Sequence, residues 1–189
     1  MLDKSLKYMD ILMKREAAPA PEIRLPEGFR FVNYLPGDEK DWARIEAAVL
    51  EFDDEAQALK YFSDTFLPHQ DELLRRCFFI EDAQTGEKAA TAMSWWELID
   101  GNRTPWLHWI GVMPGYQGKG LGVAMVGHCI AQALEIEGPV DLHLHTQTWS
   151  HRAVNIYLKY GFRVVREPLG EWKNDKVDEA LAIIAPFMR

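Results

Sequence analysis

The spacing of apolar residues predicts a short N-terminal element followed by one larger α/β domain. Leu2, Leu6, Met9 and Met13 recur at intervals of four, three and four residues, which predicts an amphipathic helix. The following AAPAPEIRLPEG carries three prolines and predicts an extended linker. We therefore expect an N-terminal helix and linker over residues 1–28 and a folded domain over residues 29–189.

The first half of this domain predicts strands separated by helices and tight turns. Asp100-Gly101-Asn102 is typical of a hairpin turn, and Pro68 interrupts the second helical region. The predicted strands cover residues 29–34, 77–81, 89–98 and 106–112, and the predicted helices cover residues 38–49 and 55–76.

In the second half helices and strands alternate, which indicates parallel strands joined by crossover helices. Residues 169–174 can supply an irregular final strand. The predicted helices cover residues 121–136, 150–160 and 177–185, and the predicted strands cover residues 140–146 and 162–165.

Composition favours a soluble globular protein, with 48% apolar and 26% charged residues in a chain of 189. No apolar stretch is long enough for a membrane span, and charges at Asp3, Lys4 and Lys7 leave no secretion signal. Cys77 and Cys129 lie far apart among apolar neighbours, which predicts buried reduced thiols and a cytoplasmic location.

The formal charge of −8 is concentrated between Asp38 and Asp100, where sixteen acidic and six basic residues give a net charge of −10. Such a chain lacks the basic surface that nucleic acid requires. In the first interpretation these acidic residues only form solvated helix faces, which is the favoured explanation. In the second interpretation they create an electrostatic field that attracts a cationic amine.

The segment WLHWIGVMPGYQGKGLGVAMVGHCIAQAL places four glycines between an apolar strand and a helix. Glycines allow the tight turns of an anion cradle, and the helix start adds N–H donors. A diphosphate fits such a loop. A P-loop is excluded because Met113 and Gly120 stand where Gly and Ser or Thr are required. A dinucleotide fingerprint fails because Val123 or Met125 replaces the third glycine.

Gln117-Gly118-Lys119-Gly120-Leu121-Gly122 instead resembles the acetyl-CoA loop of the GNAT superfamily of N-acetyltransferases. A second match lies downstream, where Ala153, Tyr157, Gly161 and Phe162 fall in register with the family pattern Asn-x-x-Ala-x-x-x-Tyr-x-x-x-Gly-Phe. The resemblance covers residues 104–166. Ser150 departs from it, because the family often has asparagine there, and this puts a cofactor contact at Ser150 in doubt.

The resemblance implies a central mixed sheet, antiparallel in its N-terminal half, with a parallel pair of strands around the cofactor. Acetyl-CoA is then the co-substrate, with no metal, and its pantetheine arm bonds the strand end at Ile110, Gly111 and Val112. The loop Gln117–Gly122 holds the diphosphate. Tyr157 matches the family tyrosine that protonates the leaving sulfur; in isolation it reads as a core tyrosine.

His108 is our candidate general base, with Glu97 as a weaker substitute, and a structural histidine is an equal alternative. His143 and His145 share a strand face with metal-ligand spacing, but a histidine-lined acceptor cleft is favoured over zinc. Trp95, Trp96, Trp106 and Trp109 read mostly as core residues, and one or two can line this cleft.

These residues predict an enzyme that acetylates a primary, cationic amine by direct attack in a ternary complex. The alternative is a non-catalytic acyl-CoA-binding sensor. A small-molecule acceptor is expected, with neither nucleic acid nor membrane as partner. The identity of the acceptor and the oligomeric state are open, a homodimer included.

Overall fold

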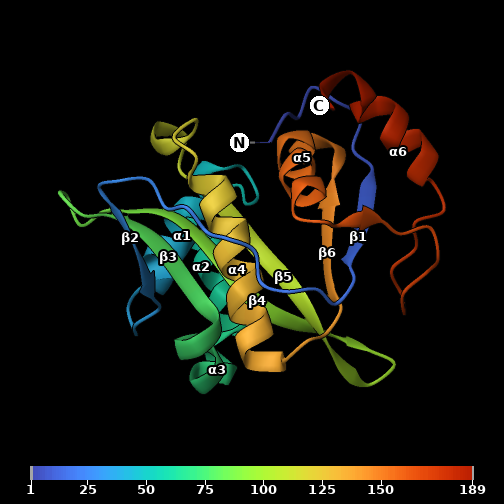
Figure 1. Ribbon diagram of the computed structural model, residues 1–189. Coiled ribbons are helices and arrows are strands. Elements are labelled where there is room, and N and C mark those ends of the chain that lie inside the picture. Colours follow the sequence, from blue (N-terminus) through green and yellow to red (C-terminus); the bar gives the residue numbers. More distant parts are fainter. Residues whose placement is uncertain (1, 189) are drawn as a thin grey trace. The chain divides into compact units, whose positions relative to one another are not determined.

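The computed structural model describes residues 2–188, which form a mixed sheet with the strand order β2-β3-β4-β5-β6-β1-β7 and flanking helices (Figure 1). The strands are β1 (Asp10–Arg15), β2 (Phe29–Asn33), β3 (Cys77–Asp82), β4 (Lys88–Ile99), β5 (Asn102–Val112), β6 (Leu142–Gln147) and β7 (Arg163–Val164). The α-helices are α1 (Glu39–Ala48), α2 (Glu55–Thr65), α3 (Gln70–Arg76), α4 (Leu121–Glu137), α5 (His151–Lys159) and α6 (Val177–Ile184).

Two compact units are distinguished along this chain. The first unit comprises residues 22–93 and 109–129, and the second comprises residues 2–21, 94–108 and 130–188. Strands β4 and β5 and helix α4 each begin in one unit and end in the other. Each unit is described by its own contacts below.

The antiparallel strands of the first unit confirm the pattern expected for the N-terminal half. Strand β2 pairs with β3, and β3 pairs with β4, both antiparallel. Helices α1 and α2 follow the predicted boundaries closely, and the predicted break at Pro68 is a short 3-10 turn, Leu67–His69, before α3. The core combines aromatic residues of α1 and α2 with those of β3, among them the fully buried Trp42, Phe62 and Phe78.

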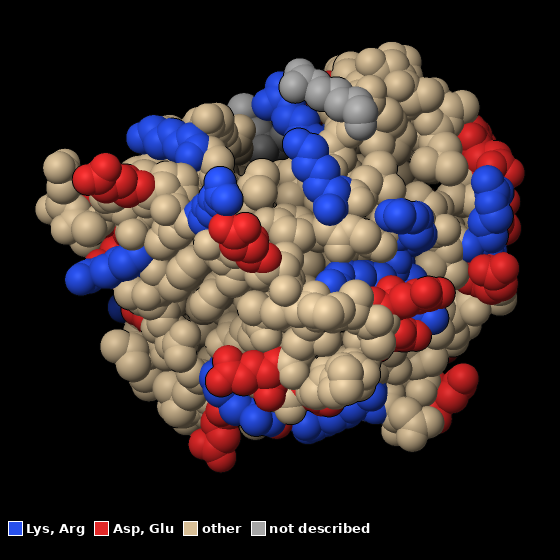
Figure 2. All heavy atoms as spheres, in the orientation of Figure 1, with Lys and Arg blue, Asp and Glu red and all other residues tan. Residues whose placement is uncertain are grey.

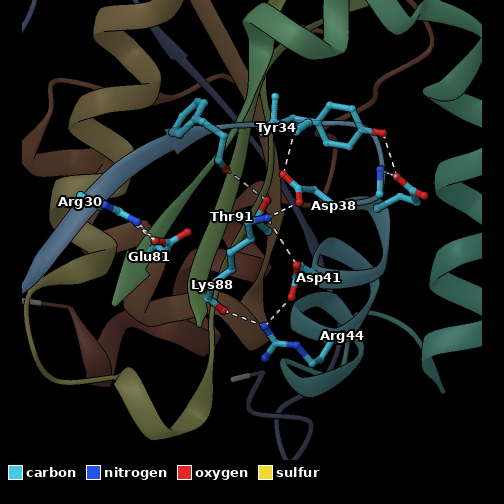
Figure 3. Close-up of polar contacts among 12 residues, drawn as sticks. Arg30, Tyr34, Asp38, Asp41, Arg44, Glu81, Lys88 and Thr91 are labelled. Atoms are coloured by element: carbon cyan, nitrogen blue, oxygen red, sulfur yellow. Dashed lines mark hydrogen bonds and ion pairs between the residues drawn. The ribbon is translucent and has the colours of Figure 1, made fainter. Parts of the chain in front are cut away.

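Several carboxylates of the acidic stretch have structural partners in this unit (Figure 3). Lys88 forms ion pairs with Asp38 and Asp41, and Arg44 bonds both Asp41 and the Lys88 carbonyl. Asp54 caps α2, because its Oδ1 accepts a hydrogen bond of 2.8 Å from the Gln57 amide. Acidic and basic side chains are also interspersed on the face in Figure 2. Only part of the acidic stretch is therefore left to act at long range.

The predicted N-terminal helix is wrong. Residues 2–9 form turns and irregular chain, and Asp10–Arg15 form β1, which pairs antiparallel with both β6 and β7. Ile11, Leu12 and Met13 are all buried, as expected for a strand covered on both faces. Hydrogen bonds to the two neighbouring strands satisfy backbone N–H and C=O groups on both edges of β1. Tertiary pairing therefore outweighs the helical spacing of its apolar residues.

The irregular final strand expected over residues 169–174 does not form. The stretch Leu169–Asn174 forms only an isolated bridge between Leu169 and Trp172. Arg15 fastens the end of β1, with its guanidinium donating to the carbonyls of Tyr160, Ala18 and Pro19. The residues after Arg15 carry no helix or strand before Phe29, as the prolines predict.

The remaining elements of the second unit confirm the predicted alternation. The chain runs from β6 through α5 to β7, and β5 pairs in parallel with β6 at Trp106 and His143. The β4–β5 turn has φ values of +50° at Asp100 and +78° at Gly101, the geometry of a tight hairpin turn. Cys77 and Cys129, which both belong to the first unit, are buried, as predicted. Between residues 2 and 188 no helix is both long and apolar enough to cross a membrane.

Candidate active site

The glycine loop leaves β5 and enters α4 within the first unit. A 3-10 turn, Pro114–Tyr116, precedes it, and the side-chain Nε2 of Gln117 donates a 3.0 Å hydrogen bond to the Val112 carbonyl. Gly118 and Gly120 have φ values of +79° and +87°, in the left-handed region that L side chains rarely adopt. At these two of the four positions, the left-handed backbone conformation therefore requires glycine.

The start of α4 supplies the donors of this loop. The first intrahelical bond runs from the Ala124 amide to the Gly120 carbonyl at 3.2 Å, so the amides of Leu121 and Gly122 precede it. Lys119 is exposed, with its ammonium 4.8 Å from the centre of the Tyr116 ring. Positive-φ glycines, helix N–H groups and an exposed lysine form a set that fits a diphosphate.

The end of β5 carries a backbone irregularity directly before the predicted pantetheine contacts. Trp109 has a φ of +50°, which is rare for a bulky residue and interrupts regular strand geometry. Gly111, two residues later, is buried against α1. A Cβ built there would lie 2.8 Å from Glu46 Oε1 and 3.0 Å from Ile45 Cγ2. Position 111 therefore has no room for a side chain.

Replacement of this glycine provides a first test of the site. We expect Gly111→Ala to lower the free energy of unfolding by about 1–3 kcal/mol, because the new methyl group forces Glu46 and Ile45 to move. Urea unfolding measures the change. Gly115→Ala is the matched control, since a Cβ there meets no atom within 4 Å, and its effect should stay within about 0.5 kcal/mol. Equal effects at the two positions would show that the contact with Glu46 is unimportant.

The structure places Tyr157, Ser150 and His108 in the second unit, whereas Ile110–Val112 and Gln117–Gly122 belong to the first. Tyr157 is a buried residue of α5, with its ring 6.0 Å from that of Phe162. Ser150 occupies the N-cap position of α5, but its side chain makes no capping hydrogen bond there.

His108 and Glu97 come together in the second unit. Nε2 of His108 lies 3.0 Å from Oε1 of Glu97, at ion-pair distance although not aligned as a hydrogen bond. The two residues that we treated as alternative bases therefore form one pair, in which the carboxylate can orient the imidazole. The His108 ring also stacks near Trp106, with ring centres 6.3 Å apart.

His143 and His145 have separate surroundings. His143 stacks on Trp106, and burial lowers the pKa of its imidazole, assisted by the nearby Lys14. His145 bonds Asp10 at 2.9 Å and packs on Trp172. Within the described chain no group of three His, Cys, Asp or Glu side chains is arranged to hold a metal ion.

Sequence reasoning missed Glu46. This residue follows Trp42 by one helical turn and is buried with it on the inner face of α1. The sequence signal that could have identified Glu46 is its position on the apolar face of the helix predicted over residues 38–49. Its proximity to Gly111 could not be predicted, because the two residues are 65 positions apart and meet only through packing.

Comparison with known proteins agrees with this combination of fold and loop. The model of the acetyltransferase (GNAT) family matches residues 40–162. The chain belongs to this family of acetyltransferases, whose members use acyl-CoA. The mixed sheet with the parallel β5–β6 pair is the GNAT fold.

Individual relatives are distant and longer. A mycothiol acetyltransferase of Actinosynnema mirum is 28% identical over 166 residues, covering 87% of this chain and 52% of the relative. A GCN5-related N-acetyltransferase from Sphaerobacter thermophilus has a TM-score of 0.64 at 18% identity, covering 85% and 49%. A tandem GNAT protein from the clavulanic acid biosynthesis pathway has a TM-score of 0.57 at 14% identity, covering 82% and 50%. The chain thus spans about half the length of these proteins.

Proposed function

We propose that this acetyltransferase transfers the acetyl group of acetyl-CoA to a primary, cationic amine by direct attack in a ternary complex. The observation that carries the proposal is the loop Gln117–Gly122, whose two positive-φ glycines open directly into the N-terminus of α4. The mycothiol acetyltransferase relatives agree with an acetyl transfer. Their acceptor does not carry over at 28% and 26% identity.

The cofactor side of the proposal uses backbone groups. Acetyl-CoA supplies an acetyl thioester, whose carbonyl carbon is open to an amine and whose sulfur departs as a thiolate. Gly118, Gly120 and the first amides of α4 bind the diphosphate. One of the N–H groups of Ile110–Val112 donates to the thioester oxygen and stabilises the negative charge that develops on it. Ser150 is given no role in binding acetyl-CoA, because the family often has asparagine at this position.

Proton transfer falls to two side chains of the second unit. His108, paired with Glu97, takes a proton from the acceptor ammonium so that the nitrogen lone pair can attack. Tyr157 gives its phenolic proton to the departing sulfur. No metal is assigned a role. The buried, uncharged state favoured for His143 suits a wall of the acceptor site more than a proton carrier.

The experiment that tests the function combines binding and turnover. Acetyl-CoA should raise the thermal unfolding temperature, because it binds the native protein and not the unfolded chain. Release of coenzyme A should then require one of a panel of primary amines. Protection by acetyl-CoA without turnover for any amine, peptide N-termini included, would favour the acyl-CoA-binding sensor instead.

A salt titration tests whether the acceptor is cationic. We expect kcat/KM for the amine to fall several-fold between about 0.05 and 0.5 M salt, because steering by exposed charges is screened over this range. Asp53→Asn with Asp54→Asn should flatten the dependence while keeping the cap of α2, since asparagine also caps helices. Glu16→Gln with Glu167→Gln, exposed carboxylates outside the acidic stretch, is the control. An unchanged slope in the Asp53/Asp54 variant would make the acidic stretch a solvated surface.

A further inference from the structure

Glu46 is a buried carboxyl group whose presence the fold does not explain. Its side chain is 1% exposed, and Oε1 has no hydrogen-bond partner among residues 2–188. Burial raises the pKa of this carboxyl well above its usual range, and the nearby Glu51 raises it further. A buried, unpaired carboxyl destabilises a protein compared with an amide or an apolar residue of the same shape. Its retention therefore points to a role in binding.

The position of Glu46 links it to the transfer reaction. Its Oε1 lies 2.8 Å from the point where a Cβ of residue 111 would stand, close to the strand end that we assign to the thioester. Helix α1 and the end of β5 both belong to the first unit, so this contact lies within one compact part of the chain. A group held by Glu46 would be close to the backbone amides of Ile110–Val112.

An aromatic cluster begins one helical turn from Glu46. Trp42 lies one turn earlier on α1, and its ring centre is 5.4 Å from that of Trp109 on β5. Phe52 and Tyr61 pack on Trp109 at 5.2 Å each, and Tyr61 is 38% exposed, so the cluster reaches the surface. Aromatic faces attract ammonium groups.

Two further polar atoms of the same cluster lack partners. Nε1 of Trp42 and Nε1 of Trp109 are buried without a hydrogen-bond acceptor in the described part of the chain. Folded proteins rarely leave such groups unpaired. The carboxyl oxygen of Glu46 and the two indole N–H groups thus lack partners within the first unit, and together they match an amine that also carries an oxygen.

We propose that Glu46 binds the ammonium group of the acceptor, and that the indole N–H groups of Trp42 and Trp109 donate to an oxygen of the same molecule. The acceptor class is then a primary amine with a nearby hydroxyl or carbonyl oxygen, such as an amino alcohol or amino sugar. This inference rests on the proposed acetylation and assigns its acceptor subsite. The positive charge of the bound ammonium group favours the ionised carboxylate and so offsets the effect of burial. Glu46 acts by holding the amine, and His108 keeps the role of base.

The decisive variant is Glu46→Gln, which preserves shape and removes the charge. Using 2-aminoethanol and glucosamine, with propylamine and cyclohexylamine as their oxygen-free counterparts, we expect kcat/KM to drop about 10- to 100-fold for all four amines, because each carries the ammonium group that Glu46 binds. The acetyl-CoA-induced rise in unfolding temperature should be unchanged. Glu55→Gln, an exposed glutamate at the start of α2, is the matched control. Trp109→Phe should reduce the preference for the oxygen-bearing member of each pair.

Stability against pH separates binding from a structural role. The pKa of Glu46 is raised in the folded state, so its contribution to stability is complete below the ordinary carboxyl pKa and is lost as pH rises through the raised value. Glu46→Gln avoids this loss, and we expect it to unfold at a higher temperature than the wild type at pH 8, with the difference shrinking toward pH 4. A variant that is less stable at every pH would indicate a structural role and overturn the inference.

Binding without turnover distinguishes the two proposals. With the protein saturated in coenzyme A, oxygen-bearing amines should raise the unfolding temperature of the wild type and not of Glu46→Gln. Equal protection or equal kcat/KM in the two proteins would overturn the role of Glu46 and leave acetylation intact. Absence of both protection and turnover in the wild type, with acetyl-CoA still bound, would remove the amine acceptor and the subsite together.

Discussion

Tyr157→Phe is expected to lower kcat about 100-fold or more while acetyl-CoA binds almost as well as before. Only the phenolic hydroxyl is lost, and general acid catalysis typically contributes at least this factor. The ring of Tyr157 is buried and packs beside Phe162, and phenylalanine keeps that packing. Single-turnover kinetics measure the chemical step, and the acetyl-CoA-induced shift in unfolding temperature measures binding.

Tyr160→Phe is the matched control for this variant. Tyr160 follows Tyr157 on the same segment, and its structural contact to Arg15 uses the backbone carbonyl, which the substitution retains. Its kcat should remain near that of the wild type. Near-normal turnover in Tyr157→Phe, with chemistry shown to limit the rate, would mean that the sulfur is protonated by water or by another residue.

Gly120→Glu is expected to abolish the stabilisation that acetyl-CoA gives the wild-type protein. The backbone at position 120 has a φ of +87°, which a side chain tolerates poorly, and the added carboxylate would repel the diphosphate at the start of α4. The measurement is the unfolding temperature with and without saturating acetyl-CoA. Acetyl-CoA at about 100 times its Kd raises the free energy of unfolding of the wild-type protein by about 2.7 kcal/mol, so the loss of this stabilisation is readily detected.

Gly138→Glu controls for strain and charge in this experiment. Gly138 has a φ of +80° at the other end of α4. A Cβ there meets no atom within 4 Å, whereas a Cβ at Gly120 would lie 3.6 Å from Pro26 Cγ, an ordinary contact. Gly138→Glu should lower basal stability in a comparable way and still respond to acetyl-CoA. An acetyl-CoA shift of wild-type size in Gly120→Glu would remove the loop from the diphosphate site.

Local sequence predicted those parts of the fold in which periodicity and turn residues agree. The boundaries of α1, α2 and α4 lie within one or two residues of expectation, because apolar spacing and the flanking Asp54, Pro68 and Gly138 indicate the same ends. The glycine loop was predictable for the same reason. The positive φ values at Gly118 and Gly120 belong to positions where only glycine fits well.

The N-terminal strand shows where local reasoning failed. Leu2, Leu6, Met9 and Met13 have helical spacing, but an isolated segment of this length is a marginal helix. Partners at least 127 residues away, on β6 and β7, decide the conformation of Asp10–Arg15. The spacing of apolar residues within the segment gives no indication of such long-range pairing.

Sequence alone therefore determined the family and indicated the candidate cofactor loop and tyrosine, because each depends on short-range geometry that a few residues specify. Tertiary structure alone decided that β1 joins the sheet, that Glu97 meets His108, and that Glu46 is buried against Gly111. These last contacts join residues from different elements. Their chemistry arises from burial and packing, which raise the pKa of Glu46 and leave its oxygen unpaired, and no local pattern encodes either effect.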